Sequence, residues 1–212
     1  IGGGATFWLS DDGGDSWRNI TPQKSTYART NVALFNPAND QEILAGDRAQ
    51  LWRSVDGGDS WQKVLDGLVF DIRISHHNPQ VCYAAVEQDN SVKLYKSVNG
   101  GADWTMLDTG NEPLISARIG LSEAPGAADY VYMWACRRNH LSRPGPLFFS
   151  GPPLLYKSTD GGATFTVTDP VGQMEAVDKN GGQGYYDLVC VASATDPETI
   201  LVGIIQLYRS TD

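Results

Sequence analysis

Two long polar segments of the sequence gather side chains that could bind a ligand. The segment 137–152 is rich in arginine, and the segment 169–184 contains acidic residues. Cations, carboxylates and aromatic rings together suit a peptide or a glycan, while the same composition also fits a solvated insertion or a contact between domains. The candidate ligand-binding residues in and beside these segments are Arg137, Arg138, His140, Arg143, Glu175, Asp178, Tyr185 and Tyr186.

Glycoside hydrolysis would need two carboxylates that face each other across a cleft, one protonated and one ionised. Glu175 and Asp178 are the acidic pair of the second segment, but they lie three residues apart on one loop. Asp47 and Asp71 lie near strand ends or in inner strands, where each could be a simple strand-edge residue. The sequence therefore favours a non-catalytic binding module, with a glycoside hydrolase as the alternative and no catalytic residue assigned.

A short repeat surrounds these segments and must position them. An eight-residue segment occurs four times, and its first residues recur every 43 to 61 positions. This spacing matches the length of one four-stranded propeller blade. The copies are Ser10–Trp17, Ser54–Trp61, Ser97–Trp104, Ser158–Phe165 and a partial fifth copy, Ser210–Asp212.

Each residue type in the repeat has a structural reason. The acid or amide at the third position can accept hydrogen bonds from backbone N–H groups of a turn. Two glycines follow because the turn needs positive φ, and the closing aromatic ring is expected to be buried against the sheet. The residues assigned to this structural role are Ser10, Asp12, Trp17, Ser54, Asp56, Trp61, Ser97, Asn99, Trp104, Ser158, Asp160, Phe165, Ser210 and Asp212.

The pattern S-x-D-G-G-x-[ST]-W resembles the Asp-box, or BNR, repeat of sialidases, sortilin-type propellers, xyloglucanase-type glycoside hydrolases and photosystem assembly factors. The resemblance implies an all-β fold, a β-propeller of four-stranded antiparallel blades whose ring is incomplete in this chain. The segment 184–212 is similar to repeats of large secreted bacterial proteins with sortilin-like propellers. It implies a secreted or cell-surface location, with the remainder of the propeller or another chain as the partner that completes the ring.

Alternating apolar segments and turn residues predict strands between the repeats. In a four-stranded meander, the third turn lies on the same rim as the first, so the repeats mark one rim and the two long segments enlarge the other. The expected single propeller fragment over 1–212 consists of a last hairpin (1–20), three blades (21–66, 67–108 and 109–168) and a partial blade (169–212).

Two enzyme families that carry the repeat can be compared with particular residues. A sialidase would need three arginines that converge on a carboxylate, and Arg29, Arg73 and Arg118 lie before or in successive inner strands. Arg73 and Arg118 are followed by Ile but not by Pro, so the Arg-Ile-Pro signature of that family is absent. Xyloglucanase-type enzymes carry a catalytic Asp after Arg-Thr, where this chain has Asn31, which cannot act as a general base.

The charge balance argues against nucleic acid as a partner. The net charge is -9, and no cluster of basic residues is longer than Arg137-Arg138. A nucleic-acid-binding domain usually presents a basic face. No apolar run approaches about 18 residues, so no membrane span is predicted. Neither a cofactor nor a metal is expected.

Three cysteines and a histidine pair fit structural roles. Cys82, Cys136 and Cys190 each lie in an apolar, strand-like segment without the C-x-x-C spacing of a zinc site. We expect them to be buried as small apolar residues. His76 and His77 are adjacent, and adjacent side chains point apart in an extended segment, so a shared metal is not expected.

Overall fold

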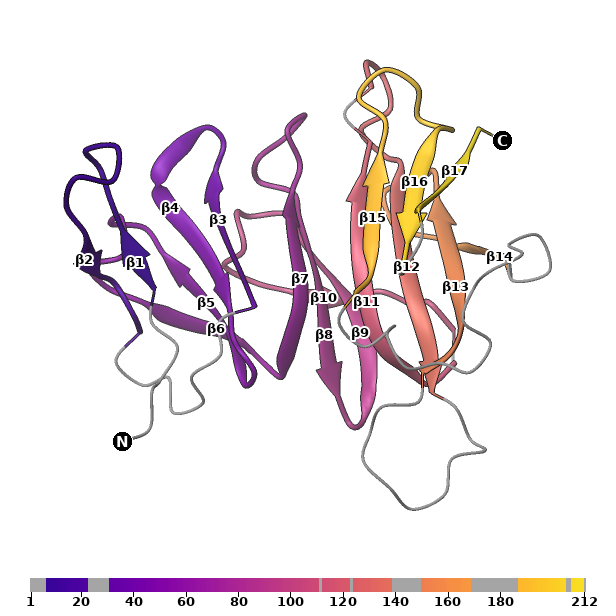
Figure 1. Cartoon of the computed structure of the whole chain (residues 1–212), viewed down its shortest axis with the longest axis horizontal. Helices are drawn as coiled ribbons and strands as arrows, with labels where there is room; N and C mark the ends of the chain where they lie inside the picture. Colours follow the sequence, from indigo (N-terminus) through magenta and orange to yellow (C-terminus); the bar gives the residue numbers. More distant parts are fainter. Residues whose placement is uncertain are drawn as a thin grey trace.

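The computed structural model describes residues 7–22, 31–110, 112–122, 124–138, 150–168, 187–204 and 207–211, and within these ranges the chain forms strands and turns without a helix. Five antiparallel sheets follow one another along the chain and stand in a row (Figure 1). The first and last sheets lie at opposite ends of that row, so the ring is incomplete in this chain. The all-β prediction is confirmed.

Each sheet takes its strands in chain order, with short turns between them. The row begins with a hairpin of β1 (Trp8–Leu9) and β2 (Arg18–Asn19). The first four-stranded sheet contains β3 (Val32–Asn36), β4 (Asn39–Gly46), β5 (Gln50–Ser54) and β6 (Gln62–Asp66). The second contains β7 (Leu68–Ile74), β8 (Cys82–Gln88), β9 (Ser91–Ser97) and β10 (Thr105–Met106).

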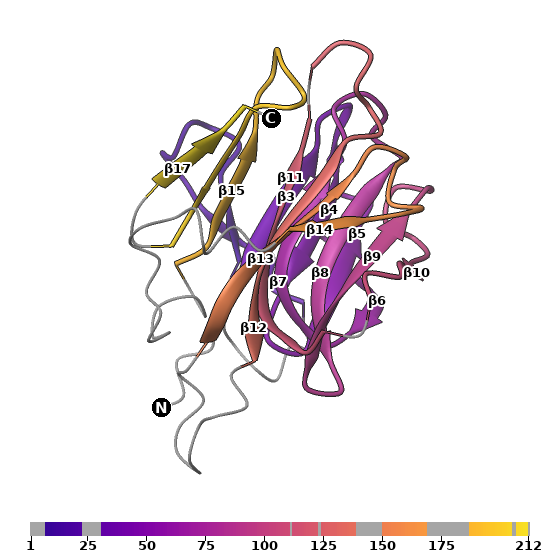
Figure 2. The same ribbon diagram turned by 90° about the vertical axis from the view of Figure 1, so that its right-hand side faces the viewer.

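The remaining two sheets complete the row. The third four-stranded sheet contains β11 (Leu114–Leu121), β12 (Val131–Arg138), β13 (Ser150–Ser158) and β14 (Thr166–Thr168). The last sheet contains three strands, β15 (Val189–Ala192), β16 (Ile200–Gly203) and β17 (Leu207–Ser210). The first strands of neighbouring sheets contact one another, β3 with β7, β7 with β11 and β11 with β15. Figure 2 shows the sheets one behind another from the end of the row.

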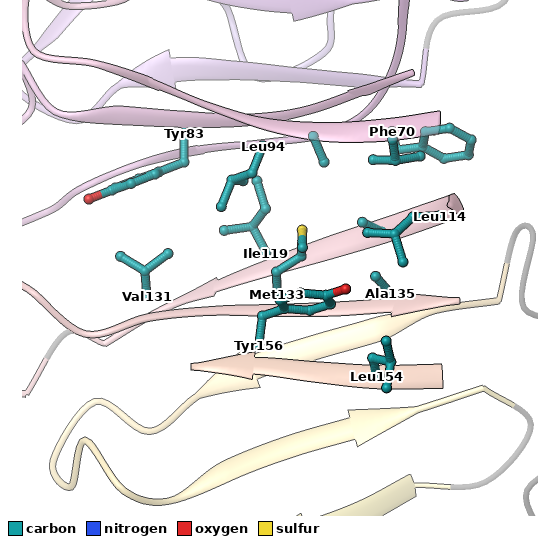
Figure 3. Packing of buried hydrophobic residues seen from close by; sticks show 13 residues of the cluster. Phe70, Tyr83, Leu94, Leu114, Ile119, Val131, Met133, Ala135, Leu154 and Tyr156 are labelled. Carbon is teal, nitrogen blue, oxygen red and sulfur yellow. The ribbon is translucent and has the colours of Figure 1, made fainter. Parts of the chain in front are cut away.

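The core lies between the faces of neighbouring sheets. Between the second and third four-stranded sheets, Leu94 and Ile119 meet Met133, and Tyr83 and Tyr156 close the same cluster (Figure 3). Alternate residues of each strand point to opposite faces, so one strand serves two cores. Burying a large apolar side chain contributes about 1.5–3 kcal/mol, which makes these faces the main source of stability.

The Gly-Gly turns share one rim with the turns between the first and second strands. Gly57 N donates to Gln41 O, and Gly100 N donates to Gln80 O, each over 2.9 Å. The connection from β12 to β13 leaves from the opposite end of those strands, where Arg138 pairs with Ser150. Figure 1 shows the same separation, with the β8–β9 hairpin at the edge away from the turns that follow β3 and β7.

The closing aromatic rings differ in burial. Trp61, Trp104 and Phe165 are half-buried against apolar clusters that include residues of the preceding sheet. Trp17 is 59% exposed, so the expectation of a buried ring is wrong at that position. The reason is that the described part of the chain holds no sheet ahead of β1 and β2 on which this ring could rest.

The cysteines behave as small apolar residues. Cys82, Cys136 and Cys190 are all buried, as the sequence predicted. Burial raises the pKa of the Cys82 thiol to about 12, which keeps it protonated and unreactive at neutral pH.

Candidate functional site

The carboxylates of the repeated turns are engaged by their own turns. Ser54 Oγ donates to Asp56 Oδ1 over 2.8 Å and accepts from Gly58 N over 2.8 Å. Asp56 also accepts from Ser60 N (2.8 Å) and Ser60 Oγ (2.5 Å). These bonds, led by the Ser60 hydroxyl, lower the pKa of Asp56 to about 2. A carboxylate held ionised in this way closes the turn and cannot serve as a general acid.

A second group of charged side chains joins the inner strands β7 and β11. Asp71 Oδ2 accepts from Ile119 N over 2.9 Å, and Arg73 Nε donates to Ile119 O over 3.0 Å. Arg118 Nη1 in turn donates to Phe70 O over 2.9 Å. Side chains here supply the hydrogen bonds that a backbone ladder would make between two paired strands. We call Asp71, Arg73 and Arg118 the inner-strand cluster.

A register shift in β7 and the spacing of its residues explain this arrangement. The pairing of β7 with β8 is irregular between Val69 and Asp71. Asp71 and Arg73 are two residues apart in a strand, so they point to the same side, and Arg73 Nη2 lies 3.3 Å from Asp71 Oδ2. This ion pair leaves the Asp71 side chain 5% exposed and that of Arg73 37% exposed.

Burial dominates the electrostatics of the inner-strand cluster. It raises the pKa of Asp71, although the neighbouring Arg73 guanidinium acts in the opposite direction. Burial also lowers the pKa of Arg118, and the Asp71 carboxylate opposes that change. A carboxyl with a raised pKa is the type that general acids use, but this one is closed off from solvent.

A hollow of about 330 Å³ lies beside the first strands of the four consecutive sheets, β3, β7, β11 and β15. Its polar side chains are Arg73 and His76, and the exposed ring of Phe35 forms part of its wall. No carboxylate is found among the described residues that line it. The full lining consists of Leu34, Phe35, Pro37, Arg73, Ile74, His76, Ile119, Gly120, Leu121, Cys190, Val191 and Ala192.

Comparison with solved structures identifies the architecture. An ancestral GH74 enzyme superposes with a TM-score of 0.61 and 19% identity over 86% of this chain and 23% of that chain. The GH74 xyloglucanase from Xanthomonas campestris superposes with a TM-score of 0.59 and 19% identity, over 85% of this chain and 28% of the xyloglucanase chain. The fold is a β-propeller. The GH74 enzyme of Niastella koreensis superposes with a TM-score of 0.50 and 18% identity, over 87% of this chain and 30% of that enzyme's chain.

The propeller match covers only part of the similar proteins. This chain spans about a quarter of the length of the first two GH74 structures. Identities of 18% and 19% show the fold alone. No protein-family model matches the sequence, and the comparison with curated proteins finds no match.

Most sequence-predicted ligand residues of the propeller lie outside the described part of the chain. These residues are His140, Arg143, Glu175, Asp178, Tyr185 and Tyr186, and the same holds for Arg29 and Asp212. Arg137 is half-buried at the end of β12, where it pairs with Leu114, and Arg138 follows it. Both therefore lie at the rim away from the Gly-Gly turns.

The sequence reasoning named Asp71, Arg73 and Arg118 for separate enzyme hypotheses and did not group them as one site. The signal that could have grouped them is the Asp-Ile-Arg alternation in β7, which places both charged side chains on one face. Asp47 has a different environment: Asp47 Oδ1 accepts from Ala49 N and Gln50 N, each over 2.7 Å. It is 2% exposed and stabilises the β4–β5 turn.

No helix among the described residues is long and apolar enough to cross a membrane. No group of three or more His, Cys, Asp and Glu side chains with the spacing of a metal site occurs among them.

Proposed function

We propose that this propeller is a non-catalytic binding or scaffold module of a larger secreted or cell-surface protein, with a peptide or a glycan as its ligand. The observation that supports this most directly is the composition of the hollow at the inner strands. It offers a half-exposed guanidinium, a histidine and an exposed aromatic ring, but no carboxylate among its described residues.

The chemistry of these groups indicates what the ligand must provide. Arg73 has one hydrogen bond to Ile119 O and an ion pair with Asp71, and its remaining N–H donors can meet an oxygen-rich group. The ring of Phe35 is 50% exposed and can pack on a sugar face or an apolar side chain. Such a pairing of one polar anchor with apolar walls is typical of binding pockets.

Further partners follow from the same proposal. The rim that carries Arg137 and Arg138 is a second surface at which a ligand could bind. We also propose that the chain is a single Asp-box propeller fragment, and that the rest of the propeller or another chain completes the ring. Nucleic acid is not a partner in this proposal, because the net charge of -9 would repel it.

A glycan array and a peptide library, probed with the purified chain, test the proposal. Phe35→Ala removes an exposed ring without opening the core, so the affinity for any ligand found should fall about tenfold or more. Arg48→Ala is the matched control, because Arg48 is exposed but lies in the β4–β5 turn, away from the hollow. Absence of any ligand, or equal losses in both variants, would contradict binding at this hollow.

A glycoside hydrolase is the second candidate. Two observations favour it: the raised pKa of Asp71, and the fold shared with a xyloglucanase. Incubation with xyloglucan and an assay for new reducing ends would detect this activity. Turnover that Asp71→Asn abolishes, in a variant that unfolds at the same temperature as the wild type, would replace the binding module with an enzyme.

A further inference from the structure

The third copy of the repeat carries a reactive pair of residues in its turn. Asn99 directly precedes Gly100, whereas the other complete copies have an aspartate at that position, such as Asp56. Asparagine is chemically labile, and an Asn-Gly pair is prone to deamidation because glycine has no side chain to hinder attack by its own backbone nitrogen. Asn99 is therefore a candidate site of covalent modification.

The deamidation reaction needs only the chain and water. The backbone nitrogen of Gly100 loses its proton and bonds to Asn99 Cγ, and the side-chain nitrogen leaves as ammonia, which closes a five-membered succinimide. Water then opens this ring at one of its two carbonyl carbons. Breaking the bond between the nitrogen and Cγ gives aspartate. Breaking the bond between the nitrogen and the main-chain carbon gives isoaspartate, whose backbone is one carbon longer.

The folded turn holds the attacking nitrogen in place. Gly100 is buried, and Gly100 N donates to Gln80 O over 2.9 Å. This N–H must leave its acceptor before the nitrogen can approach Asn99 Cγ. Asn99 itself is exposed, so water can reach its side chain. The buried nitrogen, rather than access of water, therefore limits the reaction.

The side-chain amide of Asn99 is held as well. Its Oδ1 accepts from Ser97 Oγ over 2.9 Å and from Asp103 N over 3.0 Å. Its Nδ2 donates to Asp103 Oδ2 over 2.8 Å. These three hydrogen bonds resist the rotation that would bring Cγ towards Gly100 N.

The preceding sheet clamps the same turn from outside. Arg53 Nε of β5 donates to Gly100 O over 2.8 Å, and the Arg53 side chain is only 18% exposed. Leu44 of β4 packs on Gly101, where an added Cβ would lie 2.6 Å from Leu44 Cδ2. Opening of the turn therefore requires the junction between the first and second four-stranded sheets to loosen.

We propose that Asn99 is a deamidation site that the closed junction protects, and that it is modified when the turn after β9 opens. Loss of ammonia makes the change irreversible. Aspartate as the product places a carboxylate opposite Asp103, where the amide had donated a hydrogen bond, so the modified turn closes less well. Each opening that leads to reaction thus leaves a permanent chemical mark. The proposal does not depend on any ligand at the hollow.

Peptide mapping by mass spectrometry, after incubation at neutral pH, measures the modification. It also separates Asn99 from Asn180, which precedes a glycine too and lies outside the described residues. Asn99 should deamidate at least about tenfold more slowly in the folded protein than in the protein unfolded by urea. Equal rates in the two states would overturn the proposal, because the fold would then give no protection.

Arg53→Ala removes the clamp on Gly100 O and should raise the rate at Asn99 about tenfold or more, because a hydrogen bond from a charged donor is lost. Arg18→Ala is the matched control. Arg18 Nη2 donates to Gly57 O over 2.6 Å, the corresponding carbonyl of the turn after β5, so this variant should keep the wild-type rate at Asn99. A wild-type rate in Arg53→Ala, or an equal rise in both variants, contradicts the assigned role of the clamp and overturns the proposal.

Hydrogen exchange of the Gly100 N–H tests the proposal in the wild type, and so covers the case in which Arg53→Ala does not fold. Exchange and deamidation both require this N–H to leave Gln80 O. Urea at concentrations below the unfolding transition should therefore raise both rates by the same factor. Deamidation that stays constant while exchange accelerates would show that opening of the turn does not control the reaction.

Discussion

Asn99 Nδ2 donates a hydrogen bond to Asp103 Oδ2 over 2.8 Å, which reverses the polarity found in the other described turns. In the turn after β5, a hydroxyl at the corresponding position donates to a carboxylate, from Ser60 Oγ to Asp56 Oδ2. The third copy of the repeat exchanges donor and acceptor and keeps the link. The pair of side chains, rather than the carboxylate by itself, therefore closes the turn.

Asn99→Asp should destabilise the protein, because it places two carboxylates where an amide donated to one. We expect a loss of about 0.5–1 kcal/mol in the free energy of unfolding, as for other exposed like charges. Adding Asp103→Ser recreates the pair of the turn after β5 and should restore stability. Urea unfolding of all four members of this double-mutant cycle measures the coupling. Strictly additive effects would show that the two positions act separately.

Ser54→Ala should cost about 1–3 kcal/mol in unfolding free energy, because it leaves the buried Gly58 N–H without an acceptor. The matched substitution is Ser10→Ala, which removes the same bond to Gly14 N in an exposed turn. Water can replace the hydroxyl there, so its cost should be smaller. Denaturant midpoints of the two variants provide the comparison, and equal losses would contradict the role assigned to burial.

The repeat allowed the sheets to be predicted because its interactions are local. The hydrogen bonds that Ser54, Asp56 and Ser60 make within their turn join residues no more than four positions apart. Strand β9 ends at Ser97, which is the first residue of the third copy of the repeat. The turns and strands of each sheet can be predicted from sequence because turn chemistry and strand alternation depend on near neighbours.

The inner-strand cluster could not be predicted in the same way. Asp71 accepts a hydrogen bond from Ile119 N, 48 residues further along the chain. Nothing in the sequence around either residue identifies the other, because the contact depends on how two sheets pack. The exposed ring of Trp17 has the same cause, since its burial would require a neighbouring sheet.

Acid should weaken the turns that contain a carboxylate. The hydroxyls of Ser60 and Thr164 lead the interactions that lower the pKa of Asp56 and Asp160 to about 2, from 3.8 in the unfolded chain. A lowered folded-state pKa stabilises the protein above the unfolded value, and this contribution is lost as the pH falls through about 2.

The double variant Asp56→Asn, Asp160→Asn should therefore lose less stability than the wild type between pH 4 and pH 2. Thermal unfolding across that range measures the slope for each protein. Gln62→Ala changes an exposed residue of β6 that does not titrate and should keep the wild-type slope. A double variant with the full wild-type slope would show that these turns do not cause the acid sensitivity.

Gly101→Ala should be among the most destabilising single changes in the described sheets. Gly101 has φ of +82°, and an added Cβ would lie 2.6 Å from Leu44 Cδ2, a side chain that is 3% exposed and cannot move aside. Gly14→Ala is the matched control. Gly14 has φ of +103°, but an added Cβ there would meet only the ring of Trp17, at 3.8 Å. Backbone strain should cost about 1–2 kcal/mol at either site, and overpacking should add about 1–3 kcal/mol at Gly101 alone. Urea unfolding gives both values, and equal losses would mean that Leu44 does not fix the distance between the two sheets.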